Sequence, residues 1–139
     1  MRLINPTNEE IKEILETKKR IAVVGLSDNP ARTSYQVASV MQDAGYEIIP
    51  VNPNADEILG AKAVKSLKDI EGHVDIVNVF RRSEFLLEVA KETVEIGADV
   101  FWAQLGLSNE EAYKYLKEHG VTSIMDKCIK VEYYTLLGK

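Results

Sequence analysis

The sequence predicts an α/β domain of three layers, in which a mostly parallel, doubly wound sheet lies between helices. Short apolar runs, such as residues 21–24 and 100–102, alternate with segments whose apolar residues recur every three or four positions. The runs are continuously apolar, as in strands that are buried on both faces of a sheet. Strands that alternate with helices are typical of parallel sheets with helical crossovers. We therefore expect one Rossmann-like domain over residues 1–139, because no linker, internal repeat or low-complexity segment interrupts the pattern.

A helix is predicted near the start of the chain. Thr7 has the hydroxyl of a helix N-cap, and Glu10 follows three residues later, which completes the capping-box pattern. Ile11, Ile14 and Leu15 have the spacing of one apolar helix face. The basic residues 18–20 follow, where the helix dipole favours positive charge.

The next stretch predicts a strand, a helix and a second strand. The first strand is residues 21–24, and Thr33 or Ser34 supplies the hydroxyl cap of a helix that ends at Gly45. The second strand is residues 46–51. The loop between strand and helix thus leads to a helix N-terminus, where free N–H groups and the dipole favour an anion. We interpret this loop as a phosphate-binding turn.

The second half of the chain continues the alternation. We expect a short strand or extended crossing at residues 61–64, one or two helical turns at 66–70, and strands at 74–80, 100–102 and 121–125. Three helices are expected here. The first is residues 83–96, capped by Ser83, and the second is 109–118, capped by Ser108 with Glu111 as its capping-box partner. The third is residues 129–137, in which Ile129, Val131, Tyr134 and Leu137 have helical spacing.

Composition and charge exclude several classes of protein. The net charge of −5 does not favour nucleic acid or an anionic membrane as a partner. No run approaches the roughly 20 apolar residues of a membrane-spanning helix, and no signal-peptide pattern opens the chain. The lone Cys128 excludes an internal disulfide, and His73 and His119 are too isolated to predict a metal site. We expect a cytoplasmic protein.

Ligands of open α/β sheets bind outside the carboxyl ends of the strands, near the point where the strand order reverses. The residues that follow the predicted strands carry backbone phosphate donors, apolar surface and two adjacent arginines, but no obvious base–nucleophile pair. These residues are 25–27, 52–54, 80–82, 104–106 and 126–128.

The motifs that are missing narrow the class of ligand. The dinucleotide fingerprint needs three glycines after the first strand and an acidic residue after the second, but this chain has only Gly25 and Asn52 there. No P-loop motif is present either. A neutral end of the second strand, with Arg81 and Arg82 nearby, suits a nucleotide that carries an extra phosphate on its ribose.

These residues resemble the family of small stand-alone CoA-binding-domain proteins, which is similar to the nucleotide-binding domain of the succinyl-CoA synthetase alpha subunit. The similarity runs from about residue 11 to residue 132. The matching residues are 24–27 with Arg32, Ser34 and Tyr35, then 49–53, then 74–77 with 79–81, and finally Trp102, Gln104, Gly106, Asp126 and Cys128.

The resemblance implies a site for coenzyme A or an acyl-CoA. The turn at residues 25–27 would hold the diphosphate, and residues 52–54 would lie beside the adenosine. The implied binding residues are Gly25, Leu26, Ser27, Arg32, Ser34, Asn52, Pro53, Asn54, Phe80, Arg81, Gln104 and Gly106. Position 54, often basic in similar sequences, is Asn54 here, which leaves the ribose 3′-phosphate to Arg81 or Arg82. The phosphohistidine segment of the synthetase has no counterpart, so we expect a small-molecule binding protein without ligase activity.

Other interpretations stay open for several residues. Ser34 is more typical of a helix cap than of a phosphate contact, and Arg82 more typical of a solvated charge. Cys128 is interpreted as a small buried apolar residue, with a redox role as the alternative. Tyr133 and Tyr134 either pack a helix on the sheet or belong to a homodimer surface. The alternative functions are an enzyme that acts on CoA thioesters and an interaction module with a vestigial crevice.

Overall fold

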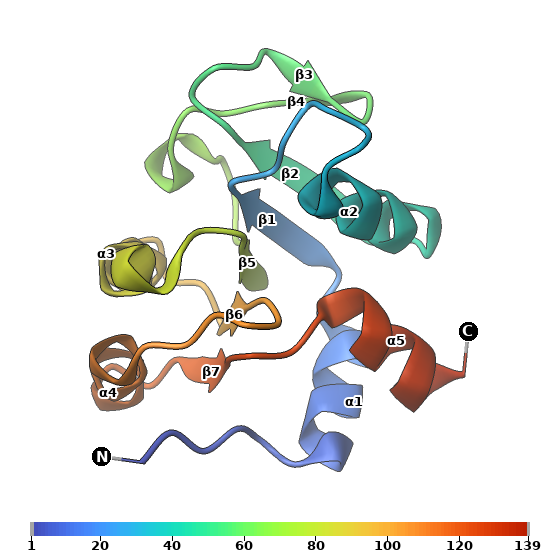
Figure 1. Cartoon of the computed structure of the whole chain (residues 1–139). Helices are drawn as coiled ribbons and strands as arrows, with labels where there is room; N and C mark the ends of the chain where they lie inside the picture. Colours follow the sequence, from blue (N-terminus) through green and yellow to red (C-terminus); the bar gives the residue numbers. More distant parts are fainter. Residues whose placement is uncertain (1, 139) are drawn as a thin grey trace.

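The computed structural model describes residues 2–138 and confirms the predicted α/β fold with a parallel central sheet. The strand order is β2-β1-β5-β6-β7, and all neighbouring strands are parallel (Figure 1). The order reverses between β1 and β5, so the topological switch point lies at the carboxyl ends of these two strands. The strands are β1 (Arg20–Val24), β2 (Glu47–Val51), β5 (Ile76–Val79), β6 (Val100–Ala103) and β7 (Thr122–Ile124).

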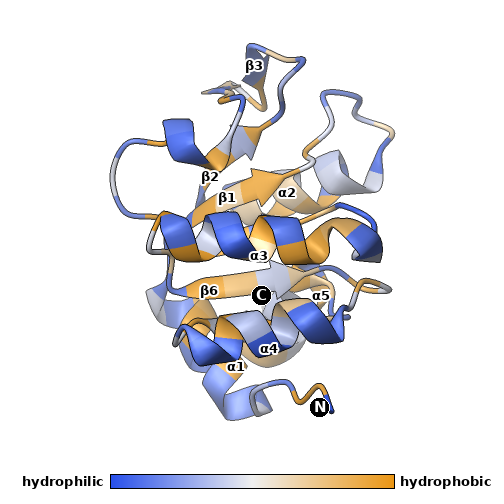
Figure 2. Ribbon diagram, turned by 90° about the vertical axis from the view of Figure 1, so that its left-hand side faces the viewer, coloured by the Kyte–Doolittle hydropathy of each residue, from blue (hydrophilic) through white to orange (hydrophobic). Residues whose placement is uncertain are grey.

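Helices cover both faces of the sheet. One face carries α1 (Asn8–Thr17), α2 (Thr33–Asp43) and α5 (Ile129–Leu137), and the other carries α3 (Leu86–Glu95) and α4 (Glu110–Glu118). Each face has its own apolar core, and neighbouring residues of β6 serve different ones: Trp102 packs on the first face and Phe101 on the second. Figure 2 shows that α3 and α4 turn their polar sides to solvent. The two cores are the physical reason for the continuous apolar runs in the strands.

The first helix begins as predicted, but the second does not. Thr7 and Glu10 form both hydrogen bonds of the capping box of α1. The cap position of α2 is Arg32, whose side chain makes no capping hydrogen bond, so Thr33 and Ser34 are not caps. The Ser34 hydroxyl is already used, because its Oγ accepts a hydrogen bond from the backbone N–H of Ser27 at 3.0 Å.

Two further predicted caps are wrong for a similar reason. Ser83 begins a short 3-10 turn, η2 (Ser83–Phe85), that precedes α3, and its Oγ accepts from the backbone N–H of Ser108 at 3.1 Å. The cap of α4 is Asn109, whose Oδ1 accepts from the N–H of Ala112 at 2.9 Å, and not Ser108 with Glu111. Ser83 and Ser108 therefore join the loop after β5 to the loop before α4, a contact that the local spacing of residues does not reveal.

The helical spacing predicted for the last helix is confirmed only in part, because Ile129 is buried and Leu137 packs on the core but the other two residues do not. Ile129 and Tyr133 are the buried residues of α5, whereas Val131 and Tyr134 are 48% and 46% exposed. Residues two positions apart project about 200° from each other around a helix, so Ile129 and Val131 cannot share a face. The Tyr133 ring packs edge-on against the ring of Tyr46, with 5.8 Å between their centroids.

Both outer strands of the sheet have additional partners. A small antiparallel hairpin of β3 (Glu57–Ile58) and β4 (Ala61–Lys62) leads to Val64, and Val64 forms a parallel bridge to Val51 of β2. The short strand or extended crossing expected at residues 61–64 is thereby confirmed, whereas β3 was not predicted. The predicted helical turn follows as η1 (Leu67–Asp69). At the opposite edge, the Asn5 side chain donates to the carbonyl of Met125 at 2.8 Å and accepts from its N–H at 2.9 Å.

No helix within residues 2–138 has the length and apolar character needed to cross a membrane.

Candidate functional site

A cavity of about 630 Å³ opens at the carboxyl ends of β1, β2 and β5, at the switch point of the sheet. It brings together three of the predicted segments: the turn after β1, the end of β2 and the residues after β5. The predicted residues that line it are Gly25, Leu26, Ser27, Asn52, Pro53, Phe80 and Arg81. Arg32 and Ser34 line an adjoining hollow that shares Gly25, Ser27 and Phe80 with the cavity.

The turn after β1 requires glycine for structural reasons. Gly25 has a φ of +85°, and a Cβ at this position would lie 2.6 Å from the backbone oxygen of Phe80. The Gly25 N–H also donates to the carbonyl of Val51 at 3.3 Å, so the turn contacts the ends of both neighbouring strands. A side chain at residue 25 would therefore disturb the fold before it affected any ligand.

The beginning of α2 lies beside this turn and leaves backbone donors free. The N–H groups in the first turn of a helix have no partner inside the helix, and no side chain caps them in α2. The bond from Ser27 N–H to Ser34, which is buried, fixes the loop against the helix. The arrangement offers N–H groups and the positive end of a helix dipole to an anion.

The end of β2 is held in place by the side chain of Asn52. Its Nδ2 donates to the carbonyl of Leu26 at 2.9 Å, and its Oδ1 accepts from the N–H of Asn54 at 2.8 Å. Asn52 thus connects the turn after β1 with the loop after β2. Asn54 itself is exposed and does not line the cavity.

Arg81 and Arg82 both reach the cavity from the end of β5. Their guanidinium carbons lie 4.5 and 5.4 Å from the centroid of the Phe85 ring, which is the distance of a cation–π contact. Arg82 is highly exposed, as predicted, and its Nε lies 3.4 Å from a carboxylate oxygen of Glu84.

Besides Asn54, two predicted residues lie outside both the cavity and the adjoining hollow. Gln104 is buried, and its Oε1 accepts from Asn78 Nδ2 and from the backbone N–H of Ile129, both at 3.1 Å. The Gly106 N–H donates to the carboxylate of Asp126 at 2.6 Å. In the structure both residues hold together the loops after β6 and β7.

One wall of the cavity was missed by sequence reasoning. Glu88 and Glu92 lie four residues apart on the side of α3 that faces the cavity, and Phe85, the N-cap of α3, lies three residues before Glu88 and also lines the cavity. Burial raises the pKa of Glu92, the negative charge of Glu88 adds to the rise, and the positive charges of Lys68 and Arg81 oppose it. The missed residues that line the cavity are Lys65, Ser66, Leu67, Phe85, Glu88 and Glu92.

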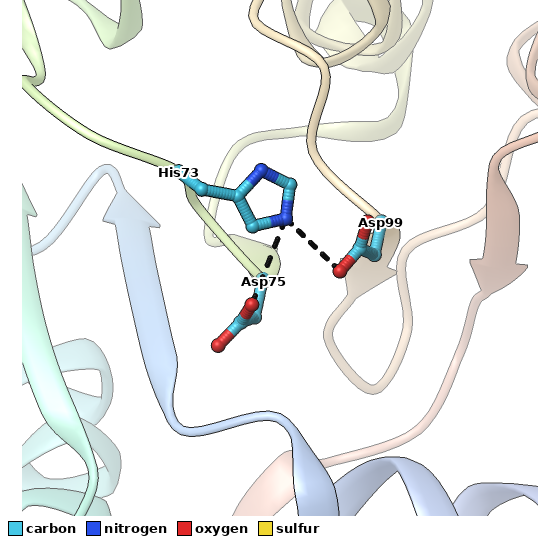
Figure 3. A group of neighbouring side chains, drawn as sticks. All are labelled: His73, Asp75 and Asp99. Carbon is cyan, nitrogen blue, oxygen red and sulfur yellow. Dashed lines mark hydrogen bonds and ion pairs between the residues drawn. The ribbon is translucent and has the colours of Figure 1, made fainter.

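A second group of polar side chains lies at the amino-terminal ends of the strands, away from the cavity (Figure 3). His73 Nε2 lies 3.0 Å from Asp99 Oδ2 and 3.7 Å from Asp75 Oδ1. These are metal-binding side chains, but the ammonium of Lys18 lies 2.9 Å from the same Asp99 oxygen. We interpret the group as an electrostatic cross-link. His73 is exposed, as predicted, although it is not only solvated.

The charges of this cross-link change the proton affinity of two of its members. Burial would raise the pKa of Asp99, but the hydrogen bonds from His73 and Lys18 outweigh burial, so the pKa is lowered. The pKa of Lys18 is raised, mainly by its hydrogen bond to Asp99.

Comparisons with known proteins place the chain in a family. YneT of Bacillus subtilis (strain 168) is 69% identical over 127 residues, which are 91% of this chain and 94% of that protein. A hypothetical protein from Pyrococcus horikoshii OT3 has a solved structure that superposes with a TM-score of 0.92 at 34% identity, over 99% of this chain and 100% of that chain.

A longer relative shares only this domain. The alpha subunit of the ADP-forming acetate–CoA ligase II of Pyrococcus furiosus is 30% identical over 122 residues, which are 80% of this chain and 27% of the subunit. The family model described as "CoA binding domain" matches residues 19–134, which confirms the predicted resemblance. This protein therefore belongs to the CoA binding domain family.

Proposed function

We propose that the protein binds coenzyme A or an acyl-CoA and has no catalytic activity of its own. The observation that carries the proposal is the cavity at the switch point, where the turn after β1, the start of α2 and the end of β2 meet. Membership of the CoA binding domain family supports CoA as the ligand.

The cavity and its adjoining hollow contain groups that suit the diphosphate, the adenine and the ribose of CoA. The free N–H groups at the start of α2 suit the diphosphate, because they combine hydrogen bonds with the helix dipole. Val24, Val51 and Leu67 add apolar side chains to the lining of the cavity, which suit an adenine ring. Asn52 and Pro53 line the cavity after the end of β2, where the ribose lies in doubly wound folds.

The polar groups of the cavity favour binding over catalysis. The hydroxyl oxygens of Ser27 and Ser66 already accept hydrogen bonds from the backbone N–H groups of Asn29 and Lys68. Among the described residues that line the cavity there is no histidine or cysteine that could activate or replace them as a nucleophile.

One observation favours an enzyme, or an enzyme subunit that acts on CoA thioesters, as the second candidate. Glu88 and Glu92 place two carboxylates in the cavity, and the raised pKa of Glu92 suits a proton donor or acceptor. Thioester turnover that is lost in a Glu92→Gln variant would establish this candidate in place of the first.

A panel of CoA, acetyl-CoA, NAD, NADP, ATP and ADP tests the proposal by thermal shift and calorimetry. A ligand that binds only the folded state must raise the melting temperature. We expect CoA and acetyl-CoA to bind more tightly than NAD, since the turn has one glycine and β2 ends at Asn52 rather than at an acidic residue. NAD binding as tight as CoA binding would contradict the proposal. No shift with any ligand would instead favour an interaction module with a vestigial crevice.

A further inference from the structure

The cavity is lined by three basic side chains that lie on two sides of the switch point. Lys65 lies on the side of β2, whereas Arg81 and Arg82 follow β5. We propose that Lys65 binds the 3′-phosphate on the ribose of CoA and thereby distinguishes CoA from nucleotides that lack this phosphate. The proposal rests on the proposed function and assigns one part of the ligand to one residue.

The first step is the position of the ribose. In doubly wound folds the diphosphate lies at the first turn, and the ribose hydroxyls lie at the end of the second strand. Here the second strand ends at Asn52 and Pro53, so a phosphate on the ribose would lie beside them. Asn54 carries no charge and lies outside the cavity, which leaves this phosphate without a cation from its own loop.

The second step is the backbone that holds Lys65 in position. The residue before it, Val64, accepts a hydrogen bond from the N–H of Asn52 at 2.9 Å and donates one to the carbonyl of Pro50 at 2.9 Å. Residue 65 is therefore fixed beside the end of β2 by strand-like pairing, although it lies 13 positions after Asn52 in the sequence. Since Lys65 also lines the cavity, we infer that its ammonium group can reach the expected position of the ribose.

The third step is that the three basic side chains differ in what they already bind. Within residues 2–138, the Lys65 ammonium has no ion pair and no side-chain hydrogen bond. Arg81 and Arg82 both lie on the Phe85 ring, and Arg82 also pairs with Glu84. An unpaired ammonium can bind a phosphate without giving up another contact, and such charge-assisted contacts are among the stronger polar interactions.

Calorimetry with CoA and with 3′-dephospho-CoA tests the assignment on the parent and on Lys65→Ala. We expect the variant to lose about tenfold to a hundredfold in affinity for CoA, the range of one charge-assisted hydrogen bond. Its affinity for 3′-dephospho-CoA should stay within about twofold of the parent value, which also shows that the variant is folded. Lys65→Arg should keep the preference for CoA, because it keeps the charge.

Two matched variants complete the test. Lys62→Ala removes an exposed lysine from the same segment but outside the cavity, and both affinities should stay unchanged. Arg81→Ala should lower the affinities for CoA and for 3′-dephospho-CoA by the same factor, because we propose that Arg81 does not contact the ribose phosphate.

Each contrary outcome has its own meaning. Lys65 does not bind the 3′-phosphate if Lys65→Ala lowers the affinity for both ligands equally. The same holds if only Arg81→Ala abolishes the preference for CoA over 3′-dephospho-CoA. If the parent binds both ligands equally, the proposed function stands and the assignment is wrong. If the parent binds neither ligand, the proposed function fails together with the assignment.

Discussion

The backbone N–H of Ser27 donates a hydrogen bond to the hydroxyl of Ser34 at 3.0 Å, so the first turn of α2 fixes the loop that precedes it. The loop and the helix N-terminus are the two parts that would hold a diphosphate. Their relative position therefore depends on one buried hydroxyl.

Ser34→Ala should destabilise the protein and weaken CoA binding. The half-buried Ser27 N–H would lose its partner, and the loss of one such hydrogen bond costs about 1 kcal/mol. Urea unfolding and CoA calorimetry measure the two effects. Ser39→Ala, on the same helix but outside the cavity, is the control and should leave CoA affinity unchanged. Equal CoA affinity in Ser34→Ala and the parent would show that the loop keeps its position without this bond.

Gly25→Ala should lower the free energy of unfolding more than Gly106→Ala does. The two glycines have nearly equal φ angles, +85° and +86°, so the strain of a left-handed alanine, about 1–2 kcal/mol, is common to both variants. Only at residue 25 would the Cβ meet another atom closely, the Phe80 oxygen at 2.6 Å. We expect a difference of at least about 1 kcal/mol in chemical denaturation. If both variants lose the same free energy of unfolding, the backbone at Phe80 moves away from the new Cβ with little loss of stability.

Cys128→Ser should leave CoA affinity unchanged. Cys128 is half-buried, lies at the N-cap of α5 and does not line the cavity. A serine hydroxyl can cap the helix, which offsets the loss of an apolar thiol, so unfolding should change by less than about 1 kcal/mol. A large affinity loss in the folded variant would assign the thiol to the binding site.

Asp99→Asn should make the melting temperature depend less steeply on pH in the acid range. The pKa of Asp99 is lower in the folded state, so its contribution is present at neutral pH and is lost as the pH falls below its ordinary value of 3.8. Lys18 has a raised pKa, and its contribution is lost only as the pH rises above its ordinary value of 10.5. Thermal unfolding from pH 2 to 8 measures the first effect. An unchanged curve in Asp99→Asn would show that other carboxylates dominate acid unfolding.

The sequence predicts the sheet, the helices and the part of the cavity that follows the strand ends, because periodicity and strand ends are local properties. It fails where a side chain has its partner outside its own helix. Ser34 and Ser83 have the hydroxyls of helix caps, but they bind loop N–H groups at residues 27 and 108. Gln104 was expected to border a ligand, yet its amide joins two loops.

The missed wall of the cavity has a different cause. Glu88 and Glu92 lie on an amphipathic helix, and charged residues of such a helix are expected to face solvent. Spacing shows which of these residues share a side of the helix, but it does not show that this side borders a cavity. Lys65 was missed because its neighbour Val64 pairs with β2 through an irregular segment.

The pairing of Asn5 with Met125 at one edge of the sheet, and of Val64 with β2 at the other, has a consequence for assembly. An open strand edge presents free backbone groups on which another chain can add a strand and start a fibre. Here the side-chain amide of Asn5 forms the two hydrogen bonds that a residue of a further strand would form with Met125. At the opposite edge, Val64 pairs with part of β2. The addition of a strand from a second copy is therefore less favourable at both edges of this sheet than at a fully open edge.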